Sequence, residues 1–148
     1  MRGWLLDTNV LSAVGPGRRP VPHEIVTWIR ARTETLHLST ISAAEIEAGI
    51  AKLRRTGASR RADHLRKWFD RILDEYADRV LPFDLAAARI AGTLDDAARA
   101  AGRHPGFADV AIAAIAKARE LVVVTLNQRH FEPLGIEVFN PWAPQRGG

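Results

Sequence analysis

The chain has 148 residues, no cysteine, a formal net charge of +4 and a pI near 10.3. This length is sufficient for one domain with a sizeable core, so we expect a single domain over residues 1–148. The lack of cysteine excludes disulfides and thiolate metal sites. No apolar run is long enough to span a membrane and no signal peptide is recognisable, which predicts a cytoplasmic protein. The basic balance favours an anionic partner.

The stretch from Trp4 to Leu11 predicts a short buried strand that ends on Asp7 and passes directly into a helix. In parallel sheets the ligand crevice lies beyond the carboxyl ends of the strands. Asp7 is therefore expected to point into a cleft. The alternative is that Asp7 only caps the helix that follows it.

The rest of the chain alternates between helix and strand patterns, which predicts an α/β sandwich around a mostly parallel sheet. Thr40 or Ser42 is expected to cap the predicted helix 40–57. This helix and the next, 59–73, are expected to form a hairpin. Asp84 is expected to cap the helix that follows it. The predicted helices are 22–32, 40–57, 59–73, 85–101 and 106–119, and the predicted strands are 36–39, 80–83, 121–125 and 136–139.

Three acids, Asp7, Glu45 and Asp109, stand at junctions that lead into helices. Because such junctions lie along one edge of a parallel sheet, the three carboxylates can share a cleft. Crowded carboxylates repel one another, and a bound cation relieves the repulsion; oxygen ligands favour Mg²⁺ or Mn²⁺. Ordinary roles remain open, with Glu45 in a capping box with Ser42 and Asp109 as a first-turn acid.

Four segments occur along the chain in this order: Leu5-Leu6-Asp7-Thr8-Asn9-Val10, Glu45-Ile46-Glu47-Ala48-Gly49-Ile50, Asp109-Val110-Ala111-Ile112-Ala113-Ala114 and Val124-Thr125-Leu126-Asn127. Together they resemble the PIN-domain ribonucleases, and among them the VapC toxins of the FitB-like branch. The resemblance covers essentially the whole chain and includes the Asn140-Pro141-Trp142 ending. It implies a three-layer α/β/α PIN-like domain with a mostly parallel sheet of about five short strands.

The resemblance further implies a metal-dependent endoribonuclease that acts as the toxin of a toxin–antitoxin pair. By position, Asp7, Glu45 and Asp109 match the catalytic acids that bind Mg²⁺ or Mn²⁺. Thr125 also matches a residue of the catalytic site, where it would position water or phosphate.

Supporting residues are implied by the same resemblance. Asn127 completes the family's Thr-x-Asn segment, and Asn9 matches the Asp-Thr-Asn turn around the first acid. The family often has a fourth acid where this chain has His130, which leaves a second metal site open. His130 could bind metal, bind a phosphate when protonated, or be an ordinary surface residue.

An acidic cleft repels RNA, so a basic rim is needed to attract the strand. The candidates are Arg18, Arg19, Arg54 and Arg55, together with further basic residues between positions 52 and 71. The alternative for most of them is a solvated helix face.

The implied partners are single-stranded or looped RNA, a second copy of the chain, and a VapB- or FitA-like antitoxin that alone reads operator DNA. An antitoxin arginine inserted among the acids would compete with metal and substrate. The alternative function is a catalytically silent RNA- or partner-binding module on the same scaffold, suggested by His130. A P-loop nucleotide hydrolase is excluded because no phosphate-cradling glycine-rich loop is present.

Overall fold

The computed structural model describes residues 2–17 and 19–144 and contains a five-stranded sheet in which every strand pairing is parallel. The strand order is β3-β2-β1-β4-β5, so β1 lies at the centre of the sheet and β3 lies at one edge. The mostly parallel sheet predicted from the sequence is confirmed. The strands are β1 (Trp4–Leu6), β2 (Leu36–Ser39), β3 (Val80–Leu81), β4 (Val122–Val124) and β5 (Val138–Phe139).

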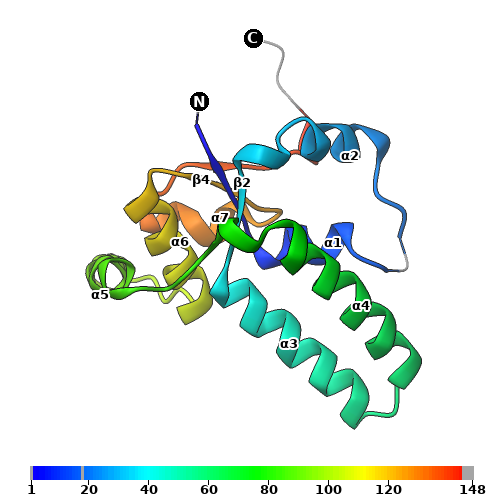
Figure 1. Ribbon diagram of the computed structural model, residues 1–148. Helices are drawn as coiled ribbons and strands as arrows, with labels where there is room; N and C mark the ends of the chain where they lie inside the picture. The colour runs from blue at the N-terminus through cyan, green and yellow to red at the C-terminus, as the bar shows by residue number, and fades with distance from the viewer. Residues whose placement is uncertain (1, 18, 145–148) are drawn as a thin grey trace.

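Helices cover both faces of the sheet, which gives the expected three-layer α/β/α arrangement (Figure 1). In the described part of the chain, none of the helices has the length and apolar character needed to cross a membrane. The helices are α1 (Thr8–Val14), α2 (His23–Arg30), α3 (Thr40–Arg55), α4 (Ser59–Glu75), α5 (Leu85–Ala100), α6 (Phe107–Arg119) and α7 (Gln128–Phe131). Three short 3-10 turns are η1 (Thr33–Thr35), η2 (Ala77–Arg79) and η3 (Glu132–Leu134).

Alternate strand residues face opposite layers, and this separates the apolar interior into two cores. Leu5 and Val123 pack with α5 and α6 on one face. Leu6 and Val124 pack with α1, α3 and α4 on the other face. Because both faces of β1 and β4 are covered, these central strands consist almost entirely of apolar residues.

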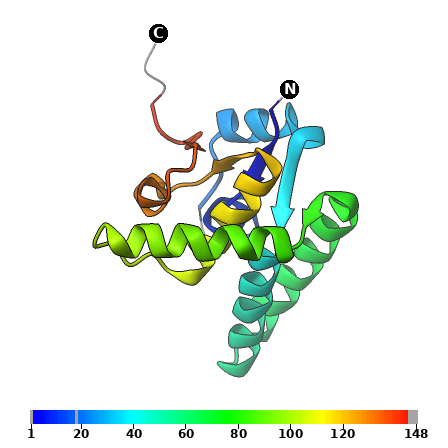
Figure 2. The same cartoon turned by 90° about the vertical axis from the view of Figure 1, so that its left-hand side faces the viewer.

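Helix α6 lies between the sheet and α5, as its apolar sequence predicts (Figure 2). All seven residues from Val110 to Ala116 are buried. Small alanine side chains allow α5 and the sheet to approach α6 closely from both sides. Asp109 lies immediately before this buried stretch, so its position is fixed by a well-packed helix.

Helices α3 and α4 form the predicted hairpin, which projects away from the sheet (Figures 1 and 2). The turn between them contains Gly57 at a φ of +88°, a conformation that L side chains rarely adopt. Along the hairpin, the Arg66 guanidinium donates two hydrogen bonds to Glu47, at 2.9 and 2.6 Å. This pairing connects the two helices beyond the edge of the core.

The predicted cap of α3 is wrong: neither Thr40 nor Ser42 is the cap. Strand β2 runs directly into the helix, so Ser39 is the N-cap and its Oγ accepts a hydrogen bond from Ser42 N at 3.0 Å. The capping box of Ser42 and Glu45 is consequently absent. The predicted cap of α5 is confirmed, because Asp84 Oδ1 accepts a hydrogen bond from Ala87 N at 3.0 Å.

Candidate active site

Asp7 lies at the carboxyl end of β1, in the middle of the sheet, and its side chain is only 6 % exposed. It is also the N-cap of α1, because its Oδ1 accepts a hydrogen bond from Thr8 N at 2.8 Å. Its other oxygen, Oδ2, accepts a hydrogen bond from the Thr125 hydroxyl at 2.8 Å. The capping interpretation of Asp7 is therefore confirmed, and the same carboxylate lies at a buried strand end; that it points into a cleft stays a prediction.

Thr125 follows β4, the neighbour of β1, and connects Asp7 to the loop that leads into α7. Its buried hydroxyl accepts hydrogen bonds from Asn127 N at 3.0 Å and Asn9 Nδ2 at 3.4 Å. Asn9 Oδ1 in turn accepts a hydrogen bond from Leu126 N at 3.3 Å. Asn9 thus connects the loops after β1 and β4. This connection fixes the position of the Asp7 carboxylate relative to the Thr125 hydroxyl.

Glu45 lies on α3 and is connected to the Asp7 segment through Thr8. Thr8 Oγ1 donates a hydrogen bond to Glu45 Oε1 at 2.7 Å and lies 2.8 Å from the buried Ser42 hydroxyl. Because Thr8 directly follows Asp7, this contact fixes the second acid relative to the first. The contact with Thr8 replaces the capping-box contact that the sequence had indicated.

Asp109 lies in the first turn of α6 and is partly buried, with a side chain 25 % exposed. Its Oδ2 lies 3.2 Å from Nδ1 of His130 on α7. The structure therefore brings His130 directly against an acid of the site. The His130 side chain is 56 % exposed, and its roles in binding metal or phosphate stay predictions.

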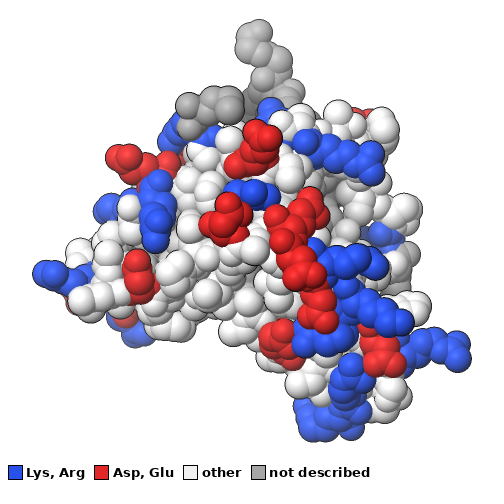
Figure 3. Space-filling model, viewed as in Figure 1, with Lys and Arg blue, Asp and Glu red and all other residues white. Residues whose placement is uncertain are grey.

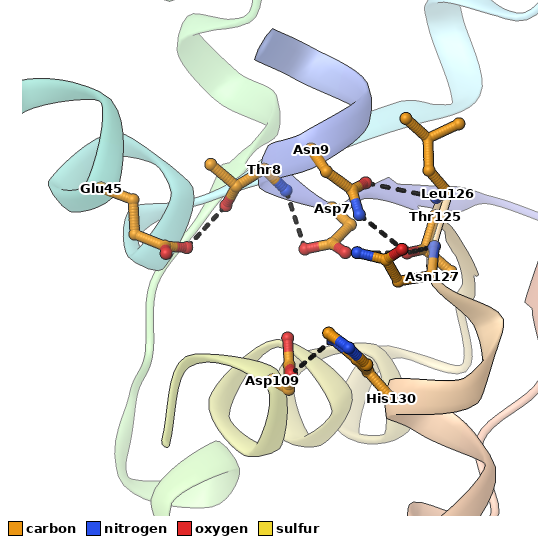
Figure 4. Close-up of polar contacts among 9 residues, drawn as sticks. All are labelled: Asp7, Thr8, Asn9, Glu45, Asp109, Thr125, Leu126, Asn127 and His130. Carbon is orange, nitrogen blue, oxygen red and sulfur yellow. Dashed lines mark hydrogen bonds and ion pairs between the residues drawn. The ribbon is translucent and has the colours of Figure 1, made fainter. Parts of the chain in front are cut away.

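The carboxylates of Asp7, Glu45 and Asp109 face one space from three elements, α1, α3 and α6 (Figure 4). Burial is the main cause that raises the pKa of Asp7 above its ordinary value, and the negative charges of Asp109 and Glu45 raise it further. Hydrogen bonds from Thr125 and Thr8 oppose this shift. Burial and the charge of Glu45 likewise raise the pKa of Asp109, while His130 opposes this shift.

The donor set fits a hard divalent cation, although the acids do not form a closed cage. Within residues 2–17 and 19–144, no three His, Cys, Asp or Glu side chains gather closely enough to hold an ion by themselves. Mg²⁺ commonly binds through one or two carboxylates and keeps several waters. In the same ranges no lysine or arginine pairs with Asp7, Glu45 or Asp109, so their mutual repulsion is not neutralised by a protein cation.

RNA binding by the predicted basic residues stays a prediction. Among those between positions 52 and 71, Arg61 lines the same pocket as Glu45. Arg54 and Arg55 lie in the last turn of α3, about 15 Å along the helix from Glu45, and Arg54 pairs with Asp63 at 2.8 Å. Figure 3 shows the basic side chains of this hairpin interspersed with acidic ones. Arg19 lines a pocket of about 720 Å³ with Leu126 and Trp142. Arg18 lies outside the described residues.

The sequence did not indicate that Thr8 and the buried Ser42 together position Glu45. A signal for Thr8 was present, because it directly follows the acid at the end of a strand. Ser42 was read as a cap because its spacing from Glu45 matches a capping box. Only the fold brings the hydroxyls of Thr8 and Ser42 together from α1 and α3.

The fold and this constellation of acids define a PIN domain, and the PIN domain family model matches residues 4–135. The chain therefore belongs to the PIN-domain family.

Two curated relatives are similar to this chain over almost their whole length. The chain is 42 % identical over 140 residues to a plasmid stability protein StbB of Pseudomonas syringae pv. tomato, covering 93 % of this chain and 97 % of the relative. It is 37 % identical over 141 residues to the VapC ribonuclease Y4jK of Sinorhizobium fredii, covering 95 % of this chain and 98 % of the relative.

Solved structures give the same result. A crystal structure of FitAcB from Neisseria gonorrhoeae matches with a TM-score of 0.82 and 35 % identity, covering 94 % of this chain and 98 % of that chain. Other structural neighbours are complexes of the FitAB and VapBC type bound to DNA. The fold expected from the resemblance is thereby confirmed.

Proposed function

We propose that this protein is a divalent-metal-dependent endoribonuclease and the toxin of a toxin–antitoxin pair. The observation that carries the proposal is the convergence of Asp7, Glu45 and Asp109 on one space. Family membership and the similarity to a VapC ribonuclease support it. RNA and an antitoxin would both be met in the cytoplasm, where we place its action.

In this proposal the three carboxylates hold Mg²⁺ or Mn²⁺. The ion, when bound, would supply positive charge to the scissile phosphate and acidify a water molecule. Asp109 lies at the more exposed side of the site, where its carboxylate would accept a proton from an attacking water. Asp7 is held on both oxygens by Thr8 and Thr125, so it serves as the fixed ligand.

The test is cleavage of a mixed pool of single-stranded RNA with Mg²⁺ or Mn²⁺. We expect cleavage by the wild type, its loss in EDTA, and its loss in Asp7→Asn. The matched control is Asp96→Asn, which makes the same charge change on an exposed position of α5. Metal-independent cleavage, or full cleavage by Asp7→Asn with its fold verified by circular dichroism, would contradict the proposal.

A catalytically silent binding module is the second candidate, and two observations favour it. The described acids form no closed metal cage, and His130 occupies the place of the family's fourth acid. RNA binding without cleavage under any divalent metal would support this alternative.

We further propose that a VapB- or FitA-like antitoxin binds the groove between α1, α3 and α4. This groove has a volume of about 340 Å³ and runs from Glu45 along Leu53, Leu65 and Trp68. Its apolar floor suits one face of an amphipathic helix or an extended segment, and its end at Glu45 suits an inserted arginine. Operator DNA would be contacted through the antitoxin.

Gly49 provides a specific test of the groove, because a Cβ at this position meets nothing within 4 Å. Gly49→Arg should leave the fold intact and weaken capture of the small protein encoded by the adjacent gene. Ala51→Arg, on an exposed position of the same helix, is the control. Equal capture by both variants would exclude this groove as the antitoxin site.

We also propose that the chain forms a homodimer. Leu85 and Phe107 are 75 % and 69 % exposed, which is unusual for large apolar side chains. They lie at the starts of α5 and α6, and Phe107 borders an apolar pocket of about 370 Å³ with Phe83 and Val110. Light scattering should show a dimer for the wild type and a monomer for Phe107→Glu; unchanged mass would exclude this face.

A further inference from the structure

A pocket of about 270 Å³ adjoins the candidate active site and shares two residues with it, Asp109 and His130. Its other polar side chains are Arg103 and His104, from the loop between α5 and α6, and Arg129 from α7. We call it the arginine pocket. Its volume is slightly below the roughly 300–1,000 Å³ of pockets that enclose a drug-sized ligand, so it suits a smaller group.

The charge of the arginine pocket is not balanced by the protein. Within residues 2–17 and 19–144, the side chains of Arg103, His104 and Arg129 form no hydrogen bond or ion pair. Two other arginines of the adjoining helices are paired: Arg99 with Asp95, and Arg119 with Asp84 at 3.7 Å. The two pocket guanidiniums are therefore available to bind an anion.

We propose that the arginine pocket binds a phosphate of the RNA strand next to the phosphate that is cleaved. This inference rests on the proposed function, because it takes the scissile phosphate to lie among Asp7, Glu45 and Asp109. Two guanidiniums present forked donors that match phosphate oxygens. A strand whose scissile phosphate reaches Asp109 must continue past this acid, and the pocket adjoins it there.

The arrangement also addresses an electrostatic difficulty of the site. Three carboxylates facing one space repel an RNA backbone, and the described basic residues of the α3–α4 hairpin are dispersed among acids. The two arginines of the pocket place positive charge beside Asp109, the acid that the pocket and the site share. They would hold the strand in register without contacting the scissile phosphate, so they are positioning residues.

The test measures binding of a fluorescein-labelled single-stranded RNA in EDTA, where metal-dependent cleavage cannot occur. We expect Arg103→Ala and Arg129→Ala each to weaken binding about two- to fivefold. Each should also reduce the slope of log affinity against log salt by about one. The control is Arg89→Ala, which removes the same charge from an exposed position on α5 outside the pocket. Both pocket variants binding RNA like the control would overturn the proposal.

A second arm identifies the group that is bound. One uncharged methylphosphonate linkage is placed, in turn, on either side of the cleaved bond. At one of these positions the wild type should bind the modified RNA more weakly than the unmodified RNA. The double variant of Arg103→Ala and Arg129→Ala should bind both RNAs equally. Equal losses in wild type and variant at every position would overturn the assignment of a phosphate.

These outcomes distinguish failure of the arginine-pocket proposal from failure of the proposed function. If the wild type fails to cleave RNA with any divalent metal, the nuclease proposal fails, while the EDTA binding data still decide whether the pocket holds RNA. If the wild type cleaves and the pocket variants bind like Arg89→Ala, only the pocket assignment fails. If the pocket variants lose binding to the acidic segment of a protein partner while their RNA binding is unchanged, the assignment of the pocket to RNA is also overturned.

Discussion

The Thr125 hydroxyl donates a 2.8 Å hydrogen bond to Asp7 Oδ2, although 118 positions separate the two residues in sequence. The contact is possible because β1 and β4 are adjacent parallel strands whose carboxyl ends meet. Asp7 N also donates a hydrogen bond to Val124 O at 2.9 Å, which continues the strand pairing up to the site. The acid is thus held by the sheet itself, with its backbone and both carboxylate oxygens fixed.

Thr125→Val should reduce both stability and cleavage. Valine has a similar shape but leaves Asp7 Oδ2 and Asn127 N without this partner, so we expect the free energy of unfolding to fall by about 1–3 kcal/mol. Urea unfolding and RNA cleavage rates measure the two effects. Thr125→Ser retains the hydroxyl and should recover most of the cleavage rate; if serine and valine behave alike, the hydroxyl has no special role.

Asp7→Asn should make the metal-free protein more stable at neutral pH. Burial and neighbouring acids raise the folded-state pKa of Asp7, so the folded protein binds this proton more tightly than the unfolded chain does. As the pH rises above the ordinary pKa of an aspartate, ionisation of Asp7 therefore lowers the free energy of unfolding. Acidification protonates Asp7 and restores this stability. We expect a gain of about 1 kcal/mol at pH 7 in EDTA, decreasing toward pH 4.

Thermal unfolding at several pH values, with EDTA throughout, measures this effect. Asp96→Asn is the exposed control and should show no comparable change. A neutral-pH Tm of Asp7→Asn that is lower than that of the wild type would mean that the capping bond to Thr8 outweighs the repulsion.

The sequence predicted the architecture well because the patterns that determine it are local. The apolar segments at Leu5 and Val123 could only be buried strands, and the apolar helix through Ile112 could only be central. Strand pairing then follows from the alternation with helices, because parallel strands require crossovers. The cap of α3 was misplaced because β2 leads into the helix without a loop, which makes Ser39 the cap.

The site was predictable to the level of which acids converge, but not how they are held. Nothing local connects Thr8 with Ser42, or His130 with Asp109, since both pairs form between separate elements. The pairing of Arg54 could not be predicted, because a run of basic residues does not show its acidic partners; Asp63 becomes a partner only when the hairpin closes. Tertiary pairing therefore decides which charges remain available.

Trp28→Ala should destabilise the fold while leaving the chemistry of the site intact. The Trp28 ring packs against Trp4 at 5.1 Å and Phe139 at 5.4 Å, and the Arg32 guanidinium lies 4.5 Å from its centre. Truncation of this aromatic cluster should lower the free energy of unfolding by about 3 kcal/mol. Leu85→Ala, at a residue 75 % exposed, should change it by less than about 0.5 kcal/mol.

Denaturant titration measures both changes, and RNA cleavage is assayed well below the Tm of each variant. Cleavage per folded molecule should match the wild type for Trp28→Ala. A selective loss of cleavage in the folded Trp28→Ala protein would instead connect the aromatic cluster to the site.

His130→Asp should place a second carboxylate directly against Asp109. The present Nδ1 to Oδ2 distance is 3.2 Å, so a carboxylate there would face Asp109 closely. In EDTA we expect the Tm to fall, with a loss of about 0.5–1 kcal/mol because the position is half exposed. In Mn²⁺ the extra carboxylate adds an oxygen ligand, so the rise in Tm with metal should exceed that of the wild type. His64→Asp, on an exposed position of α4, makes the same chemical change as a control. A metal-induced rise no larger than that of the wild type would show that the site does not extend to position 130.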